Sequence, residues 1–414
     1  MSEDTKYSPY RWVILFIGWF LFSVLMMNCY AVVPRAYDLI PALGLTLAQF
    51  SLIVTAQTLV AIFLSIPGGM LGDRFGIKWI VGLGGGICAM AGILRMNATS
   101  FASMFGFQLA IGLAIALSFP NLPKMVAIWF PPKEVGLATG LFMTGMGVGM
   151  ALILAVGAAF STWQQAMLNV GIVMAVVTAL WLLIVRSTPL KEASVDAHAF
   201  ESVGIMESLT YNLKQKNTWL IGIAQFLFTG AFISITGSFP HMLGHIHKVP
   251  PTVAGAISSS LAFAMVGGHI IGPAISDRLG LRKPIFYITM VMTAVCVFFA
   301  WLTAMSTATW FLLIAAGLFL GSGIPILMTF PVELPEIGHK WAGGCTGIIL
   351  AMGSVGGFIT MPYIFTPIAR TSPTLGYATM AILLGATILP LLAVPETGTR
   401  ARASAAGSSK RWVA

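Results

Sequence analysis

Charged residues are scarce in this 414-residue chain, since only 8% are Asp, Glu, Lys or Arg, against about a quarter in soluble proteins. Hydrophobic residues make up 57%. One soluble core cannot bury that much apolar surface, because a single core stops growing at about 250–300 residues. The composition therefore excludes a soluble globular protein and predicts that lipid surrounds the chain.

Motifs for chemistry are also missing. The four cysteines lie in separate apolar runs without metal-ligand or redox spacing, and we interpret them as packing residues. No catalytic, phosphate-binding or nucleic-acid-binding pattern is present. The sequence predicts no enzymatic activity, no cofactor, no bound metal and no nucleic-acid partner.

Apolar stretches of about 20 residues, the length of a membrane-crossing helix, occur twelve times. Alternating stretches of about ten residues, typical of membrane barrels, do not occur. The first run is too long for a signal peptide. We therefore predict an all-α polytopic membrane protein with spans at 11–33, 47–71, 79–98, 102–130, 135–160, 163–186, 218–240, 252–275, 284–304, 308–332, 342–366 and 373–394.

Lysine and arginine are distributed unevenly between the two sides. With twelve spans both termini share one side, and that side carries 17 of the 22 basic residues while the other carries four. The positive-inside rule predicts cytoplasmic termini. We expect a multi-pass protein of the plasma membrane, which is the inner membrane in a bacterium, and the net charge of +9 follows from topology.

A polar segment divides the chain into two halves. We predict a six-helix bundle at 1–186, a cytoplasmic linker at 187–217 with a short surface helix from Phe200 to Leu213, a second six-helix bundle at 218–395, and a cytoplasmic tail at 396–414.

A short motif occurs once in each half. Asp73-Arg74 follows the second span and Asp277-Arg278 follows the eighth. Corresponding spans then point the same way, so the halves are parallel repeats. This arrangement is typical of transporters whose two bundles rock about a site at the middle of the membrane.

The motif resembles the cytoplasmic loop signature of the major facilitator superfamily, which is glycine, three residues, Asp-Arg, then glycine and a basic residue. The resemblance covers essentially the whole chain and implies twelve helices in two bundles around a central cavity. It also implies a conformational latch; an alternative is that these residues only form turns and set topology. The matching residues are Gly69, Asp73, Arg74, Gly76 and Lys78, with Asp277 and Arg278 in the second copy.

A narrower resemblance is to the cyanate/nitroimidazole and nitrate/nitrite branches of that family. It rests on segments 93–95, 118–124, 129–134 and 137–140. Two departures from the nitrate branch argue against nitrate itself as the substrate. The glycine-rich segment 144–149 lacks the asparagine of the nitrate signature, and Gln108 stands near the position where many relatives carry arginine.

Lys124 is the main candidate for binding an anion. It lies deep in the fourth span, just after Pro120 and Pro123, and an ionisable residue at such a position is costly unless it is paired or solvated. A cation in a kinked polar helix suits an anionic substrate. The alternatives are that Lys124 reaches the cytoplasmic surface or pairs with a structural carboxylate.

Two residues are candidates for proton coupling. Glu333 ends the tenth span at the position equivalent to Lys124, so the two could face each other across the two-fold axis; the alternative is a cap at the cytoplasmic rim. His269 lies within the eighth span and could relay protons or simply pack.

Further polar residues could line the pathway. Arg35 is expected at the outer mouth, where a cation draws anions in. Uncharged candidates for substrate binding are Asn28, Tyr30, Gln57, Asn121 and Gln225, for which hydrogen bonding between helices is the competing account. Gly145 and Gly149 are expected at the moving boundary between the halves.

These features predict a secondary active transporter that moves a small anion, inorganic or carboxylate, by alternating access. The expected partners are that substrate, protons as coupling ion and the lipid bilayer, with the protein a monomer. The alternatives are an exporter of amphipathic or aromatic compounds and a membrane sensor that does not transport.

Overall fold

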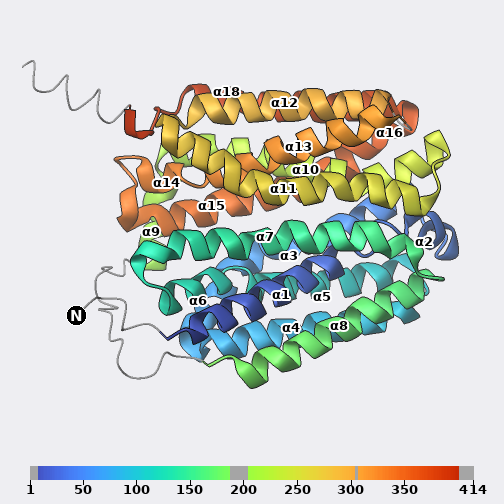
Figure 1. The fold of residues 1–414 in the computed structure, drawn as a ribbon, viewed down its shortest axis with the longest axis horizontal. Helices are drawn as coiled ribbons and strands as arrows, with labels where there is room; N and C mark the ends of the chain where they lie inside the picture. Colours follow the sequence, from blue (N-terminus) through green and yellow to red (C-terminus); the bar gives the residue numbers. More distant parts are fainter. Residues whose placement is uncertain (1–7, 187–203, 304–305, 401–414) are drawn as a thin grey trace, which may run out of the picture.

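The computed structural model describes residues 8–186, 204–303 and 306–400, and these residues contain helices and no strand. Twelve helical stretches are long and apolar enough to cross a membrane. Figure 1 shows them in two groups, with α1–α8 in one half of the molecule and α10–α18 in the other. The predicted all-α fold with twelve spans is confirmed.

The N-terminal half consists of α1 (Tyr10–Tyr30), α2 (Ala36–Ala42), α3 (Leu47–Phe75), α4 (Ile77–Leu94), η2 (Arg95–Asn97), α5 (Phe101–Ser118), α6 (Leu122–Trp129), α7 (Pro132–Val156), η3 (Gly157–Ala159) and α8 (Trp163–Ile184).

The connecting helix α9 (Ile205–Leu213) precedes the C-terminal half. That half consists of α10 (Lys216–His247), α11 (Pro251–Leu279), α12 (Lys283–Leu302), α13 (Thr307–Leu327), α14 (Phe330–Glu333), α15 (Gly338–Ile359), the π-helical turn η4 (Thr360–Phe365), α16 (Thr366–Thr371), α17 (Pro373–Ala386) and α18 (Ile388–Leu392). Residues 187–203 and 401–414, which include parts of the predicted linker and tail, lie outside the described residues.

The fourth span, predicted at 102–130 with a kink near Lys124, is two helices. Pro120 and Pro123 lie at the break between α5 and α6, because proline removes a backbone donor and its ring clashes with the preceding turn. The tenth span breaks in the same way between α13 and α14. Each half thus ends its fourth span in a short separate helix.

Both described chain ends lie at the same end of the molecule. We call it the terminal end; it carries α6, α9 and α14, whereas α2 and α16 lie at the far end (Figure 1). The seventh span continues beyond its predicted boundary, so that His241, His245 and His247 lie in the last turns of α10, whereas a loop was predicted.

The halves meet along two antiparallel helix pairs, α3 with α15 and α7 with α11. A Cβ at Gly147 of α7 would lie 2.9 Å from Val266 of α11. The prediction that Gly145 and Gly149 lie at this boundary is wrong, since both pack on α1 beside Ser23. Residues four apart share a helix face, so the residue midway between them points the other way.

Candidate substrate-binding site

Lys124 forms an ion pair within its own half. The ammonium lies 2.7 Å from both carboxylate oxygens of Asp73 and donates to the Gly69 carbonyl at 2.9 Å. The two side chains are 37% and 58% exposed, so the pair contributes at most about 1 kcal/mol. Asp73 and Lys124, predicted as a latch and a substrate ligand, are thus partners at the terminal end.

Asn121 joins α3 to the break in the fourth span. Its amide nitrogen donates to the carbonyls of Gly68 and Leu117, both at 2.8 Å. Gly72 lies against the same amide, where a Cβ would overlap it. These contacts match the competing account given for Asn121, hydrogen bonding between helices.

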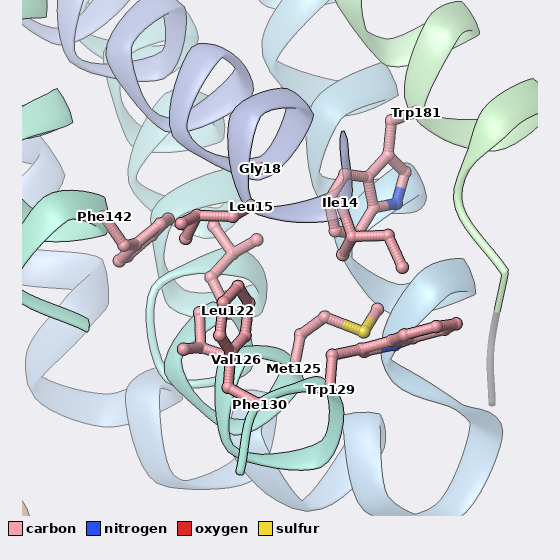
Figure 2. Close-up of a pocket in the computed structure, with 10 residues that line it drawn as sticks. All are labelled: Ile14, Leu15, Gly18, Leu122, Met125, Val126, Trp129, Phe130, Phe142 and Trp181. Carbon is pink, nitrogen blue, oxygen red and sulfur yellow. The ribbon is translucent and has the colours of Figure 1, made fainter. Parts of the chain in front are cut away.

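The opposite face of α6 lines an apolar pocket. Figure 2 shows Leu122, Met125 and Trp129 of α6 below Ile14 and Gly18 of α1, with Trp181 of α8 at the side. None of the ten lining residues is charged. Its lining is apolar except for the indole N–H of Trp129, and it shows that α6 is amphipathic, with Lys124 on the side toward α3.

Glu333 also has its partner in its own half. Its carboxylate accepts from Arg282 Nη2 at 2.7 Å and from Thr397 Oγ1 at 2.7 Å, and Arg282 Nη1 donates to Asp277 at 2.6 Å. Bonding to Glu333 and then to Asp277 raises the pKa of Arg282, against the opposing effect of burial. The predicted approach of Glu333 to Lys124 is therefore replaced by two separate ion pairs, one in each half.

The segment after the twelfth span binds the loop between α11 and α12. Glu396 accepts from the backbone N–H groups of Arg282 and Lys283 at 2.8 and 3.0 Å. Lys283 Nζ donates in return to the carbonyls of Leu392 and Val394. A carboxylate at a helix start and an ammonium at a helix end complement the helix dipoles, so the first residues of the predicted tail are docked.

The other motif residues form turns and surface contacts. Gly76 and Gly280 end α3 and α11 with φ of +91° and +65°, conformations that favour glycine. Arg74 lies over the ring of Phe75 and Lys78 over the ring of Trp79, while Arg278 is exposed in the last turn of α11.

Arg35 is buried at the far end, where it fastens one turn to another. It pairs with Asp38, and its Nη1 donates to the Phe160 carbonyl at 2.7 Å. The connection between α1 and α2 is thereby held to the turn before α8. Its charge is balanced by that carboxylate.

Asn28 belongs to a second buried network at the far end. Its carbonyl and side-chain oxygens accept from Arg95 at 2.9 and 3.2 Å, and Arg95 also donates to Gln108 at 3.1 Å. Gln108 in turn donates to the Cys29 carbonyl at 2.9 Å. Asn28 therefore points into its own bundle, away from the other half.

Side chains of both halves converge at Gly357 of α15. A Cβ there would lie 3.3 Å from the methyl carbon of Thr58 on α3 and 3.4 Å from that of Thr229 on α10. Thr229 accepts from Gln225 at 3.1 Å. Ile233 lies nearer still, at 2.7 Å, and the Thr58 hydroxyl donates to the Thr55 carbonyl of its own helix at 2.6 Å. Gln225 and the Thr229 hydroxyl border Gly353, one turn earlier on α15.

Two further predicted ligands, Tyr30 and Gln57, differ in their neighbours. Tyr30, at the end of α1, interacts with Thr236 of α10. Gln57 is buried on α3 beside α5, and among the described residues its side-chain oxygen has no hydrogen-bond partner, as is also true of Gln225. Because a buried unpaired polar group costs about 1–3 kcal/mol, these oxygens are open to a ligand or water.

By its helical spacing, His269 lies on the same side of α11 as Ala262. It is seven residues, about two turns, beyond Ala262, which borders Gly147 of α7. Its Nδ1 lies 2.6 Å from the Met265 carbonyl, so one ring nitrogen is engaged within the helix.

The structure brings together Lys124 with Asp73 and Gln225 with Thr229. It keeps Lys124 apart from Arg35, which lies at the far end, and from Glu333, which lies in the other half. Sequence reasoning did not select Thr58, Thr229, Arg282 or Glu396 as site residues. The proximity of Asp277, Arg282 and Glu396 to predicted helix ends was the available signal for the last two.

Comparison with known proteins finds relatives that are named as membrane transporters. Over 76% of the chain and 79% of the relative, the sequence is 26% identical to NarK2 of Mycobacterium tuberculosis, named as a nitrate/nitrite transporter. It is 22% identical over 87% of the chain to SauU of Cupriavidus necator, named as a sulfoacetate transporter, with 89% of SauU covered.

A solved structure shares the fold. A bacterial homologue of the human lysosomal transporter Spinster, in an inward-facing, unoccupied conformation, superposes with a TM-score of 0.71 at 18% identity, covering 93% of this chain and 95% of that one. The sequence profile described as Major Facilitator Superfamily matches residues 12–361. Twelve spans, the repeated loop motif and this match together establish that the chain belongs to the major facilitator superfamily.

Proposed function

We propose that this protein is a secondary active transporter of a small anion, working by alternating access between its two halves. The observation that carries the proposal is the meeting of Thr58 of one half with Thr229 of the other at Gly357, with Gln225 one turn away at Gly353, where side chains of both halves can contact one substrate. A substrate held by both halves couples its own binding to their relative movement.

The anionic substrate is supported by the named relatives, since nitrate, nitrite and sulfoacetate are all anions. Near this point the Thr229 hydroxyl accepts from Gln225 and keeps its own hydrogen to donate to an anion. No described side chain at this point carries a negative charge that would repel an anion.

Lys124 and Arg35 take supporting places in this proposal. Each already pairs with a carboxylate, so a direct bond to substrate would have to displace that partner. We propose that the Asp73–Lys124 pair and the Asp277–Arg282–Glu333 cluster tie the loops to the short helices of spans four and ten and act in conformational change.

Proton coupling is assigned to His269 in this proposal. It lies on the same side of α11 as Ala262, which borders Gly147 of the other half, and histidine titrates near physiological pH. Glu333 is less suited, because Arg282 balances its charge. We propose from the positive-inside rule that the terminal end faces the cytoplasm, and that the unit of transport is a monomer in the plasma membrane.

The test is uptake of nitrate, nitrite, sulfoacetate and succinate into proteoliposomes, with and without a pH gradient. We expect uptake of at least one anion, with KM raised about tenfold in Thr229→Val and Gln225→Leu, the effect of losing one hydrogen bond of about 1.4 kcal/mol. Thr379→Val, whose hydroxyl bonds only its own helix at Leu375, is the matched control and should leave KM unchanged.

His269→Ala should abolish the response to the pH gradient while anion exchange continues. Loss of that response in Glu333→Gln instead would move the proton site. If no anion is taken up but an aromatic dye such as ethidium is exported, the protein is an exporter of amphipathic compounds. A folded protein that moves neither would support the sensor.

A further inference from the structure

One buried guanidinium in the described part of the chain is bonded only to neutral groups. Arg95 is fully buried, and its hydrogen bonds go to the two oxygens of Asn28 and to Gln108, with Nε unpaired. The other buried arginines of the described residues, Arg35 and Arg282, each pair with a carboxylate. Arg95 therefore brings a positive charge into the bundle without a carboxylate to balance it.

The end of α1 offsets part of this charge. The carbonyls of Asn28 and Cys29 are among the last four of that helix, which have no partners inside it, and a helix end carries about half a negative charge. Arg95 and Gln108 bond these two carbonyls. About half a positive charge is left over, and burying unbalanced charge inside a membrane protein costs several kcal/mol.

This cluster lies directly behind the boundary between the halves. The residue after Cys29 is Tyr30, which interacts with Thr236 of α10. At the next residue of that helix, a Cβ at Gly237 would lie 2.9 Å from Val54 of α3. The positive charge is thus separated from the far-end contact of the two halves by the last turn of α1.

We propose that Arg95 is a specificity-determining residue that favours anions at the far end of the pathway. Its charge acts through the surrounding protein and through the end of α1 that it holds, without touching the substrate. Electrostatic interactions inside protein are screened less than in water, so a fixed charge there lowers the free energy of a passing anion. This inference rests on the proposed function and adds a residue to it.

Gln108 provides a charge-relocation test. Its side chain, on α5, accepts from Arg95 at 3.1 Å, and an arginine at 108 would place the guanidinium in the same cluster. We compare Arg95→Gln, Arg95→Lys and the double variant Arg95→Gln/Gln108→Arg. Arg370→Gln, which removes an exposed charge at the far end, is the matched control.

The measurement is the initial rate of uptake of nitrate and sulfoacetate into proteoliposomes at several concentrations, giving KM and Vmax. We expect Arg95→Gln to raise KM about tenfold, the size of one charge acting through protein, with a smaller change in Vmax. The KM of Arg95→Lys and of the double variant should lie within about threefold of the wild-type value. The KM of the control Arg370→Gln should lie within about twofold of it.

A KM for Arg95→Gln equal to that of Arg370→Gln overturns the inference and leaves the transporter assignment intact. A tenfold rise that persists in the double variant also overturns it, because the charge has been restored. If Arg95→Gln does not fold, the KM values of the double variant and of Arg95→Lys are judged by the same threefold limit, and a KM outside it overturns the inference. Failure of the wild type to take up either anion overturns the inference together with its anionic substrate.

Discussion

Burial decides how much each ion pair of this protein contributes. In the Arg282–Glu333 pair the side chains are 10% and 13% exposed, and Arg282 also bonds Ser276 and Asp277. The Lys124–Asp73 pair has equally short distances but is open to solvent. Water screens the exposed pair and leaves its residues well solvated when the partner is lost, whereas a buried charge without its partner is costly.

Glu333→Gln should therefore destabilise the protein more than Asp73→Asn. We expect a loss of about 2–4 kcal/mol for Glu333→Gln and of at most about 1 kcal/mol for Asp73→Asn. The measurement is thermal unfolding of the purified protein in detergent. The double variant Glu333→Gln/Arg282→Met should recover part of the loss, and equal unfolding temperatures for the two single variants would contradict this account.

At the scale of helices, glycine sets how closely α3 and α5 approach. A Cβ at Gly68 of α3 would overlap the backbone carbonyl of Ala116 on α5. Since the obstructing group is backbone, no side-chain rotation can relieve the overlap, and the helices would have to separate. Close approach through small residues is a main source of helix association in membranes.

Gly68→Ala should cost about 1–3 kcal/mol through forced separation of the two helices. Gly86 on α4 is the matched control, because a Cβ there would meet nothing within 4 Å. Gly86→Ala should be neutral or stabilise by up to about 1 kcal/mol, since alanine is the better helix former. Unfolding temperatures of the two variants check this, and a destabilised Gly86→Ala with an unaffected Gly68→Ala would refute it.

At the scale of the whole molecule, the far end holds the two halves together. Ser51 Oγ of α3 lies 2.6 Å from Thr366 Oγ1, which starts α16 in the other half. The nearby rings of Phe50 and His241 also meet across the boundary, with centroids 6.2 Å apart. The proposed alternating access would require these contacts to separate during each cycle.

A cross-link at this contact should stop transport. We expect the disulfide in Ser51→Cys/Thr366→Cys to abolish uptake and dithiothreitol to restore it, because the bond joins two elements that must part. The four native cysteines are all buried, which limits their interference. Each single cysteine variant should transport normally under oxidation, and full uptake by the cross-linked protein would exclude movement at this contact.

The sequence alone determined the membrane class, the twelve spans, the repeat and the family. These depend on local composition: a span needs about 20 apolar residues, and Asp73-Arg74 with Asp277-Arg278 repeats a pattern that can be seen without contacts. The break near Lys124 was also predictable, because Pro120 and Pro123 disrupt a helix wherever it packs.

Only the tertiary structure decided which charges are balanced and which polar groups meet. Asp73 and Lys124 are 51 residues apart, and Arg282 reaches Glu333 across the same separation. Arg35 pairs with Asp38, whereas Arg95 bonds only neutral groups. This difference depends on helix rotation and packing, which hydropathy does not encode. Since the free energy of a buried charge is set by the few atoms around it, the roles of these residues follow from the packed bundle.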